Sequence, residues 1–233
     1  MSVIATSRRG DQAFFIAAAV CFATIVLWGF GFELDELRHY VSFTPLVQAH
    51  GVVMFGWIAL FFIQVVLVVR GRTDWHRRLG VLGAVLAALI IVLGLPTATV
   101  ASRLGGDHLP PGVSSTVFLL NAYSDFLMFT LLAGAGLALR AHSAWHKRLM
   151  LMANFPPLNA ALVRLVAYLH LTVGTATLRA TLALLFIAID TIRHRRLHPA
   201  FASSAGILLA NELACDWLAG SAVWARFAGA LLS

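Results

Sequence analysis

The stretch QAHGVVMFGWIALFFIQVVLVVRGRTDWHRRLGVLGA, residues 48–84, contains two apolar runs separated by a short basic loop. With its flanking residues, each run is long enough to cross a bilayer as an α-helix, which needs about 20 residues. The loop holds Arg70, Arg72, Arg77 and Arg78. Because cytoplasmic loops of membrane proteins are enriched in arginine and lysine, the stretch predicts a membrane hairpin with a cytoplasmic loop.

The whole chain has the composition of a membrane protein. Of its 233 residues, 60% are hydrophobic and only 12% are charged, whereas soluble domains have roughly 25% charged residues. We expect a single all-α domain, residues 1–233, that forms a polytopic transmembrane bundle. Its seven expected spans cover residues 13–32, 45–69, 79–101, 115–139, 149–171, 174–192 and 200–218. The net charge of +7 does not indicate a nucleic-acid partner, because the basic residues lie between apolar segments.

The distribution of charge predicts the orientation. Arginine and lysine gather before the first span and after the second, fourth and sixth spans, whereas the opposite loops hold Glu33, Asp35, Glu36 and Asp107 with only Arg38 and Arg103. This asymmetry predicts a cytoplasmic N-terminus and a periplasmic C-terminus. Residues 221–233 form a short amphipathic segment, for which we expect an interfacial location with Trp224 and Arg226 as anchors.

A short basic motif occurs three times. WHRRL at 75–79 and WHKRL at 145–149 precede the third and fifth expected spans, and HRRL at 194–197 precedes the seventh. The first two copies suggest tandem hairpins at 45–101 and 115–171. We interpret the motif mainly as a topology signal whose basic side chains face anionic lipid headgroups. These basic residues are Arg77, Arg78, Lys147, Arg148, Arg195 and Arg196. The histidines of the motif, His76, His146 and His194, are poor candidates for ligands of a site inside the membrane.

Polar residues inside the spans are the strongest indication of a site, because ionisable groups there are costly and usually face a bundle interior. His50, Asp125, Arg164 and Arg179 fall at a similar depth in four different spans. Helical spacing adds neighbours on the same faces. The predicted outward-facing pocket therefore comprises His50, Trp57, Gln64, Asn121, Asp125, Arg164, Tyr168 and Arg179. Asp125 and Arg164 are also candidates for an internal ion pair.

The fifth expected span contains Pro156-Pro157. Two prolines remove two backbone donors, so we expect a kink or a break. Asn154 and Asn159 flank the prolines and are candidates to bond the freed carbonyl groups.

Three functions fit these residues. The first is binding of haem b or a metal for membrane electron transfer, with His50 and His170 as ligands. The second is transport or sensing of a small anionic ligand that Arg164, Arg179 and His50 would bind, with Asp125 as the proton-coupling or balancing charge. The third is a structural or accessory role beside partner subunits in a membrane complex. The sequence leaves open whether any reaction is catalysed. It excludes a retinal protein, because the only lysine, Lys147, lies in a loop.

The stretch at residues 48–84, together with HKRLM at 146–150 and RRLHPA at 195–200, resembles a signature of bacterial polytopic inner-membrane proteins. In that group a His-Gly pair opens a span, a glutamine follows within it, and an H-R-R-L-G loop leads into the next span. The resemblance implies the bacterial inner membrane and no particular activity. That group often has a second histidine two positions before the His-Gly pair, where this chain has Gln48.

Overall fold

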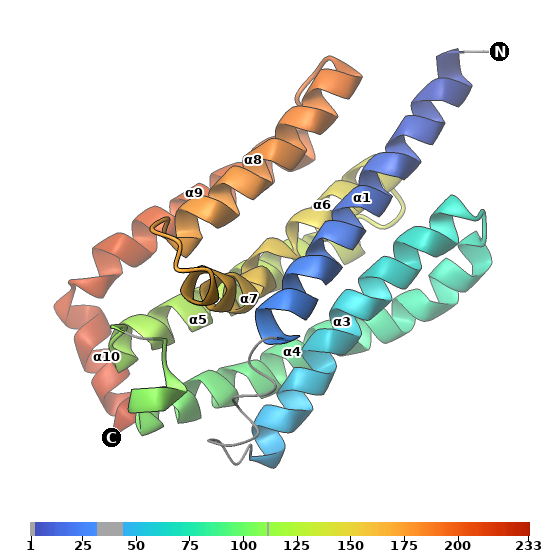
Figure 1. The fold of residues 1–233 in the computed structure, drawn as a ribbon. Coiled ribbons are helices and arrows are strands. Elements are labelled where there is room, and N and C mark those ends of the chain that lie inside the picture. Colours follow the sequence, from blue (N-terminus) through green and yellow to red (C-terminus); the bar gives the residue numbers. More distant parts are fainter. Residues whose placement is uncertain (1–2, 32–43, 111) are drawn as a thin grey trace. The chain divides into compact units, whose positions relative to one another are not determined.

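The computed structural model describes residues 3–31, 44–110 and 112–233, and every regular element within them is a helix (Figure 1). The all-α prediction is therefore confirmed. The helices are α1 (Val3–Gly31), α3 (Pro45–Val69), α4 (Thr73–Leu104), the 3₁₀ turn η1 (Gly106–His108), α5 (Ser115–Ala138), α6 (Ser143–Met152), α7 (Phe155–Tyr168), α8 (Thr175–His194), α9 (Pro199–Ala219) and α10 (Ala222–Leu232).

Six helical segments of the described chain are long and apolar enough to cross a membrane. They are Gly10–Gly31, Pro45–Val69, Thr73–Leu104, Ser115–Ala138, Ser143–Tyr168 and Thr175–His194. The chain is therefore a multi-pass helical membrane protein. Helix α9 forms where we expected a seventh span, but it is not among the six. Its Asn211, Glu212 and Asp216 make it more polar, so a seventh span stays a prediction.

The orientation of the chain also stays a prediction. Four of the charged residues on which it depends, Glu33, Asp35, Glu36 and Arg38, lie outside the described residues, as does the side chain of Asp107.

The residues group into two compact units. The first unit comprises Met1–Ser42, Val52–Ala87 and Leu158–His198, and the second comprises Phe43–Gly51, Ala88–Pro157 and Pro199–Ser233. Each of the two predicted tandem hairpins contributes residues to both units, so this division does not follow the suggested duplication. The duplication itself stays a prediction.

The turn that follows α3 explains why the opening stretch folds as a hairpin. Gly71 has a φ of 72°, a left-handed conformation that glycine adopts at little cost and that commonly ends a helix. The amide of Arg72 donates to the carbonyl of Leu67 at 2.8 Å, which satisfies one of the last carbonyl groups of α3. Helix α4 then begins at Thr73, with Asp74 in its first turn, where a negative charge stabilises the helix dipole.

Aromatic side chains fill the core of the first unit. Phe22 of α1 is fully buried, and its ring lies 5.6 Å from that of Phe186 on α8 and 6.1 Å from that of Phe61 on α3. Near the C-terminal end of α1, Gly29 lies directly against α7. A Cβ at this position would come 2.9 Å from the Cα of Ala161. Helix α1 is therefore in contact with α3, α7 and α8 within this unit.

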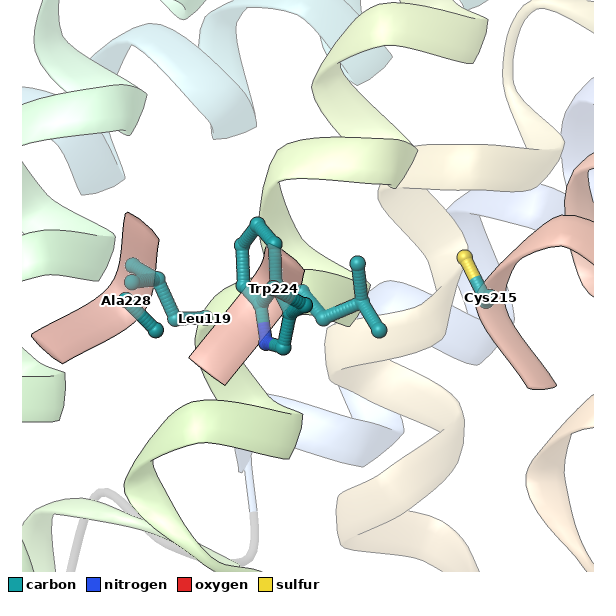
Figure 2. Packing of buried hydrophobic residues seen from close by; sticks show 5 residues of the cluster. Leu119, Cys215, Trp224 and Ala228 are labelled. Atoms are coloured by element: carbon teal, nitrogen blue, oxygen red, sulfur yellow. The ribbon is translucent and has the colours of Figure 1, made fainter. Parts of the chain in front are cut away.

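In the second unit, α5 packs against α6 and α9, and α10 packs against both α5 and α9. Where α10 meets α5 and α9, buried side chains form a cluster (Figure 2). It consists of Leu119, Leu120, Cys215, Trp224 and Ala228. The indole nitrogen of Trp224 donates to the carbonyl of Thr116 at 3.0 Å. Trp224 is thus a buried packing residue, whereas Arg226 is exposed. The interfacial location of this segment stays a prediction.

The break at Pro156-Pro157 is confirmed. The fifth span consists of two helices, α6 and α7, with a turn at Ala153–Asn154 between them. Proline cannot donate a backbone hydrogen bond, so the carbonyl groups of the preceding turn need other donors. The turn itself leaves the carbonyl of Met150 without its usual donor, because the amide of Asn154 donates to the carbonyl of Leu151. The side chain of Asn154 replaces that donor, since its Nδ2 donates to the carbonyl of Met150 at 2.7 Å. The polar side chain that accompanies the prolines therefore stabilises the interrupted helix.

Candidate functional site

His50 lies in the second turn of α3, within the second unit. Its side chain is half-buried, and Nδ1 is buried with no hydrogen-bond partner among the described residues. The imidazole ring stands edge-to-face against the ring of Phe126 on α5, with centroids 6.0 Å apart and planes at 83°. A buried imidazole nitrogen without a partner is uncommon, because leaving such a group unsatisfied costs about 1–3 kcal/mol.

The packing of Phe126 is set by a glycine. A Cβ added to Gly94 of α4 would overlap the Phe126 ring, so only glycine leaves room for the ring at this position. The glycine thus allows α4 to approach α5 closely, and the Phe126 ring in turn packs against the imidazole of His50. The sequence did not single out either residue, because a glycine and a phenylalanine in apolar spans carry no polar signal.

Trp57 and Gln64 follow His50 along α3 at seven-residue intervals, and α3 is continuous, so the three residues recur on one helix face. Both belong to the first unit. Trp57 is buried, with 3% of its surface exposed. The Oε1 atom of Gln64 is buried and, within the described part of the chain, has no hydrogen-bond partner.

Asn121 and Asp125 lie one turn apart on α5 in the second unit, with Asn121 exposed and Asp125 half-buried. Between them, the Ser124 hydroxyl donates to the carbonyl of Asn121 at 2.9 Å and accepts from Nδ2 of Asn211 at 3.4 Å. The polar face of α5 therefore continues onto α9. Sequence reasoning missed Ser124 and Asn211, although Ser124 directly precedes Asp125.

Arg164 lies on α7 in the first unit, half-buried. Its guanidinium carbon is 4.4 Å from the centroid of the Phe30 ring, and its Nη1 donates to the carbonyl of Ala160 at 2.9 Å. The cation–π contact stabilises the charge inside a span. Tyr168, one turn later, ends the helix and is exposed.

Arg179 is the most enclosed cation that we predicted for the pocket. It lies in the second turn of α8 in the first unit and is 9% exposed. His170, the candidate second haem ligand, is exposed in the turn after α7, with a φ of 50°. The predicted pocket residues thus belong to two units, and their convergence on one pocket, like the pairing of Asp125 with Arg164, stays a prediction.

The basic side chains of the motif differ in exposure, and their contact with lipid headgroups stays a prediction. Arg77, Arg78, Arg195 and Arg196 are exposed and Lys147 is half-buried. Arg148, which we expected to face lipid headgroups, is buried with 3% exposed. Its guanidinium lies 5.7 Å from the Phe201 ring of α9 and donates to the carbonyl of Ala144. The packing of α9 over this turn encloses the side chain.

Two histidines of the motif have structural partners. His146 shares a hydrogen bond of 2.7 Å with the carbonyl of Gly136. His194 contacts Asp11 and Asp190. Sequence reasoning overlooked Asp190, which is fully buried although it is an acidic residue inside an expected span.

A site for a bare metal ion receives no support. Within the described ranges, no three or more histidine, cysteine, aspartate or glutamate side chains group in a way that could hold a metal ion. Haem differs in this respect, because the porphyrin supplies the equatorial ligands of the iron and the protein supplies only axial ones. A single histidine such as His50 is sufficient for haem and insufficient for zinc.

The chain matches no protein-family model, no curated protein and no solved structure. The resemblance to bacterial inner-membrane proteins therefore depends on the quoted motifs alone.

Proposed function

We propose that this membrane protein binds one b-type haem through His50 and takes part in membrane electron transfer. The observation that carries the proposal is the buried Nδ1 of His50, which lacks a hydrogen-bond partner among the described residues. Coordination to iron would satisfy this nitrogen, because a neutral imidazole binds metals through a free ring nitrogen. Bound haem would supply one-electron redox chemistry.

The surroundings of His50 support a ligand role over a purely structural one. A structural histidine inside a span is expected to bond a neighbour through its polar atoms, as His146 does with the Gly136 carbonyl. His50 instead packs its ring against the apolar ring of Phe126. An apolar neighbour fixes the plane of the imidazole and does not compete for its nitrogen. We propose a single protein ligand, because His170 is exposed in a turn.

A second candidate function is binding of a small anion for transport or sensing, and the burial of Arg179 favours it. Buried cations inside spans often mark substrate pathways. Arg179 and Arg164 both belong to the first unit, and the proposed anion site includes these two arginines. Loss of anion-dependent thermal stabilisation in an Arg179→Gln variant is the result expected if this second function holds.

The proposed location is the bacterial inner membrane, with the N-terminus in the cytoplasm. Exposed Arg77 and Arg78 at the start of α4 support this orientation, because arginine is retained on the cytoplasmic side. Anionic lipid headgroups are the proposed partners of these side chains.

An absorption spectrum tests the haem proposal against the anion proposal. The protein is purified from cells supplied with a haem precursor and measured oxidised and dithionite-reduced, together with its iron content. We expect a Soret band that shifts on reduction. A protein that lacks both the band and iron, and that suitable anions stabilise, would support the second function instead.

A further inference from the structure

One cluster of charged residues in the first unit connects the beginning of α1 with the end of α8. An oxygen of Asp11, Oδ1, lies 3.2 Å from Nη2 of Arg193 and 3.1 Å from Nε2 of His194. The other ring nitrogen of His194, Nδ1, lies 2.9 Å from the backbone carbonyl of Asp190 and 3.4 Å from its Oδ1. The imidazole of His194 therefore stands between two carboxylates from two helices.

Two of these side chains are partly exposed and the third is fully buried. The side chains of Asp11 and His194 are 22% and 26% exposed, whereas that of Asp190 is 0% exposed. Asp190 also lies within the membrane-spanning segment Thr175–His194. The three residues thus form a path from accessible groups at the end of two spans to a carboxyl group in the interior, where an ionised acid is costly.

The hydrogen bonds of His194 require an additional proton. A neutral imidazole has only one N–H, so one of its nitrogens acts as an acceptor. In this cluster each nitrogen faces oxygen atoms, which are acceptors unless a carboxyl group is protonated. Whichever nitrogen bears the proton, the other lies against a lone pair. The cluster is satisfied only when one further proton resides on the ring or on a carboxyl group.

If this cluster only held α1 against α8, the contacts of His194 would not be needed. The contact of Arg193 with Asp11 already joins the two helices, and Gly10 makes room for it, because a Cβ there would come 2.7 Å from Nη2 of Arg193. Arg193 also contacts Phe14 of α1, because its guanidinium carbon lies 5.4 Å from the centroid of the Phe14 ring. His194 adds a connection to the buried Asp190 that the arginine does not provide.

We propose that Asp11, His194 and Asp190 form a proton relay that loads the buried carboxyl group of Asp190. A proton on the Asp11 carboxyl passes to Nε2, which leaves a carboxylate and an imidazolium. The proton on Nδ1 then passes to Oδ1 of Asp190, which becomes a neutral carboxylic acid, and the ring is neutral with its proton on Nε2. The steps in reverse return the proton to Asp11, whose carboxylate Arg193 stabilises. The relay does not depend on the haem proposal.

Infrared difference spectroscopy of the full chain in detergent tests the relay. A rapid shift from alkaline to acidic buffer is expected to produce the C=O band of a protonated carboxyl group, which Asp190→Asn removes. In His194→Gln we expect this band to appear roughly 100-fold more slowly, the lower end of what a positioned proton-transfer group contributes. His142→Gln, a change at an exposed histidine, is expected to leave the rate unchanged.

Three results would overturn the relay. The first is a wild-type protein that shows no band removed by Asp190→Asn, since Asp190 then takes up no proton. The second is an unchanged rate in His194→Gln, which would leave the cluster as a clamp between helices. If His194→Gln does not fold, Asp11→Asn at the accessible end replaces it, and an unchanged rate in that variant contradicts the relay equally.

Discussion

The ring of Phe126 lies edge-to-face against the imidazole of His50 and also occupies the space that a side chain at position 94 would need. One aromatic side chain thus meets α3 and α4 within the second unit. The contact with Gly94 determines how closely α4 approaches α5, and the contact with His50 orients a ring whose Nδ1 has no hydrogen-bond partner in the described part of the chain.

The Gly94–Phe126 contact predicts a paired mutational effect. We expect Gly94→Ala to destabilise the protein by about 1–3 kcal/mol, because the new methyl group overlaps a ring that is held on both sides. In the Gly94→Ala background, Phe126→Leu is expected to restore part of the loss. Thermal unfolding in detergent of the two single variants and the double variant measures this coupling. Strictly additive effects would contradict the contact.

Gly29 provides a second test of close packing, in the first unit. A Cβ at Gly29 would lie 2.5 Å from the carbonyl oxygen and 2.9 Å from the Cα of Ala161. Because backbone atoms cannot move aside as a side chain can, we expect Gly29→Ala to lower the free energy of unfolding by about 3 kcal/mol. Gly134→Ala on α5 is the matched control, since nothing lies within 4 Å of its added Cβ. Equal stability of the two variants would be inconsistent with this packing.

Trp224 predicts a smaller effect from a single hydrogen bond. Trp224→Phe retains an aromatic ring but removes the donor to the Thr116 carbonyl. We expect a loss of about 1 kcal/mol, the usual net value of such a bond. Trp217→Phe on α9 changes a tryptophan that is 71% exposed and is expected to be neutral. The hydrogen bond is unimportant if both variants unfold at the same temperature.

The orientation can be tested at the two ends of α4. This helix has 32 residues and is about 48 Å long at the usual rise per residue. In a background in which Cys21 and Cys215 are replaced by alanine, a cysteine at His108 should react with an impermeant thiol reagent added to intact cells. A cysteine at Thr73 should react only after the cells are opened. Both positions are exposed, and the reverse pattern would contradict a cytoplasmic N-terminus.

The sequence predicted the spans well because their signal is local. An apolar run of sufficient length has few alternatives to a membrane helix, and the break at Pro156-Pro157 follows from the missing backbone donors. The more polar composition of α9 is visible in Asn211, Glu212 and Asp216, and it separates this helix from the six apolar ones.

Side-chain environments were harder to predict, because they depend on neighbours that are distant in sequence. Arg148 and Arg78 occupy equivalent places in two copies of one motif, yet only Arg148 is buried, under Phe201 of α9. Asp190 could have been predicted from the sequence, because it is an ionisable residue inside an expected span, which is the criterion that selected Asp125. The contact of Asp190 with His194 means that one copy of the motif also makes a contact inside the first unit.

The most direct test of the proposed function is the haem content of His50→Ala compared with that of the wild-type protein. Both are expressed with a haem precursor, purified in the same detergent and assayed as the pyridine haemochromogen, with His142→Ala as a control at an exposed histidine. We predict about one haem per chain in the wild type and His142→Ala, and none in a folded His50→Ala. Equal haem content in His50→Ala and the wild type, or no haem in any of the three, would contradict the proposal.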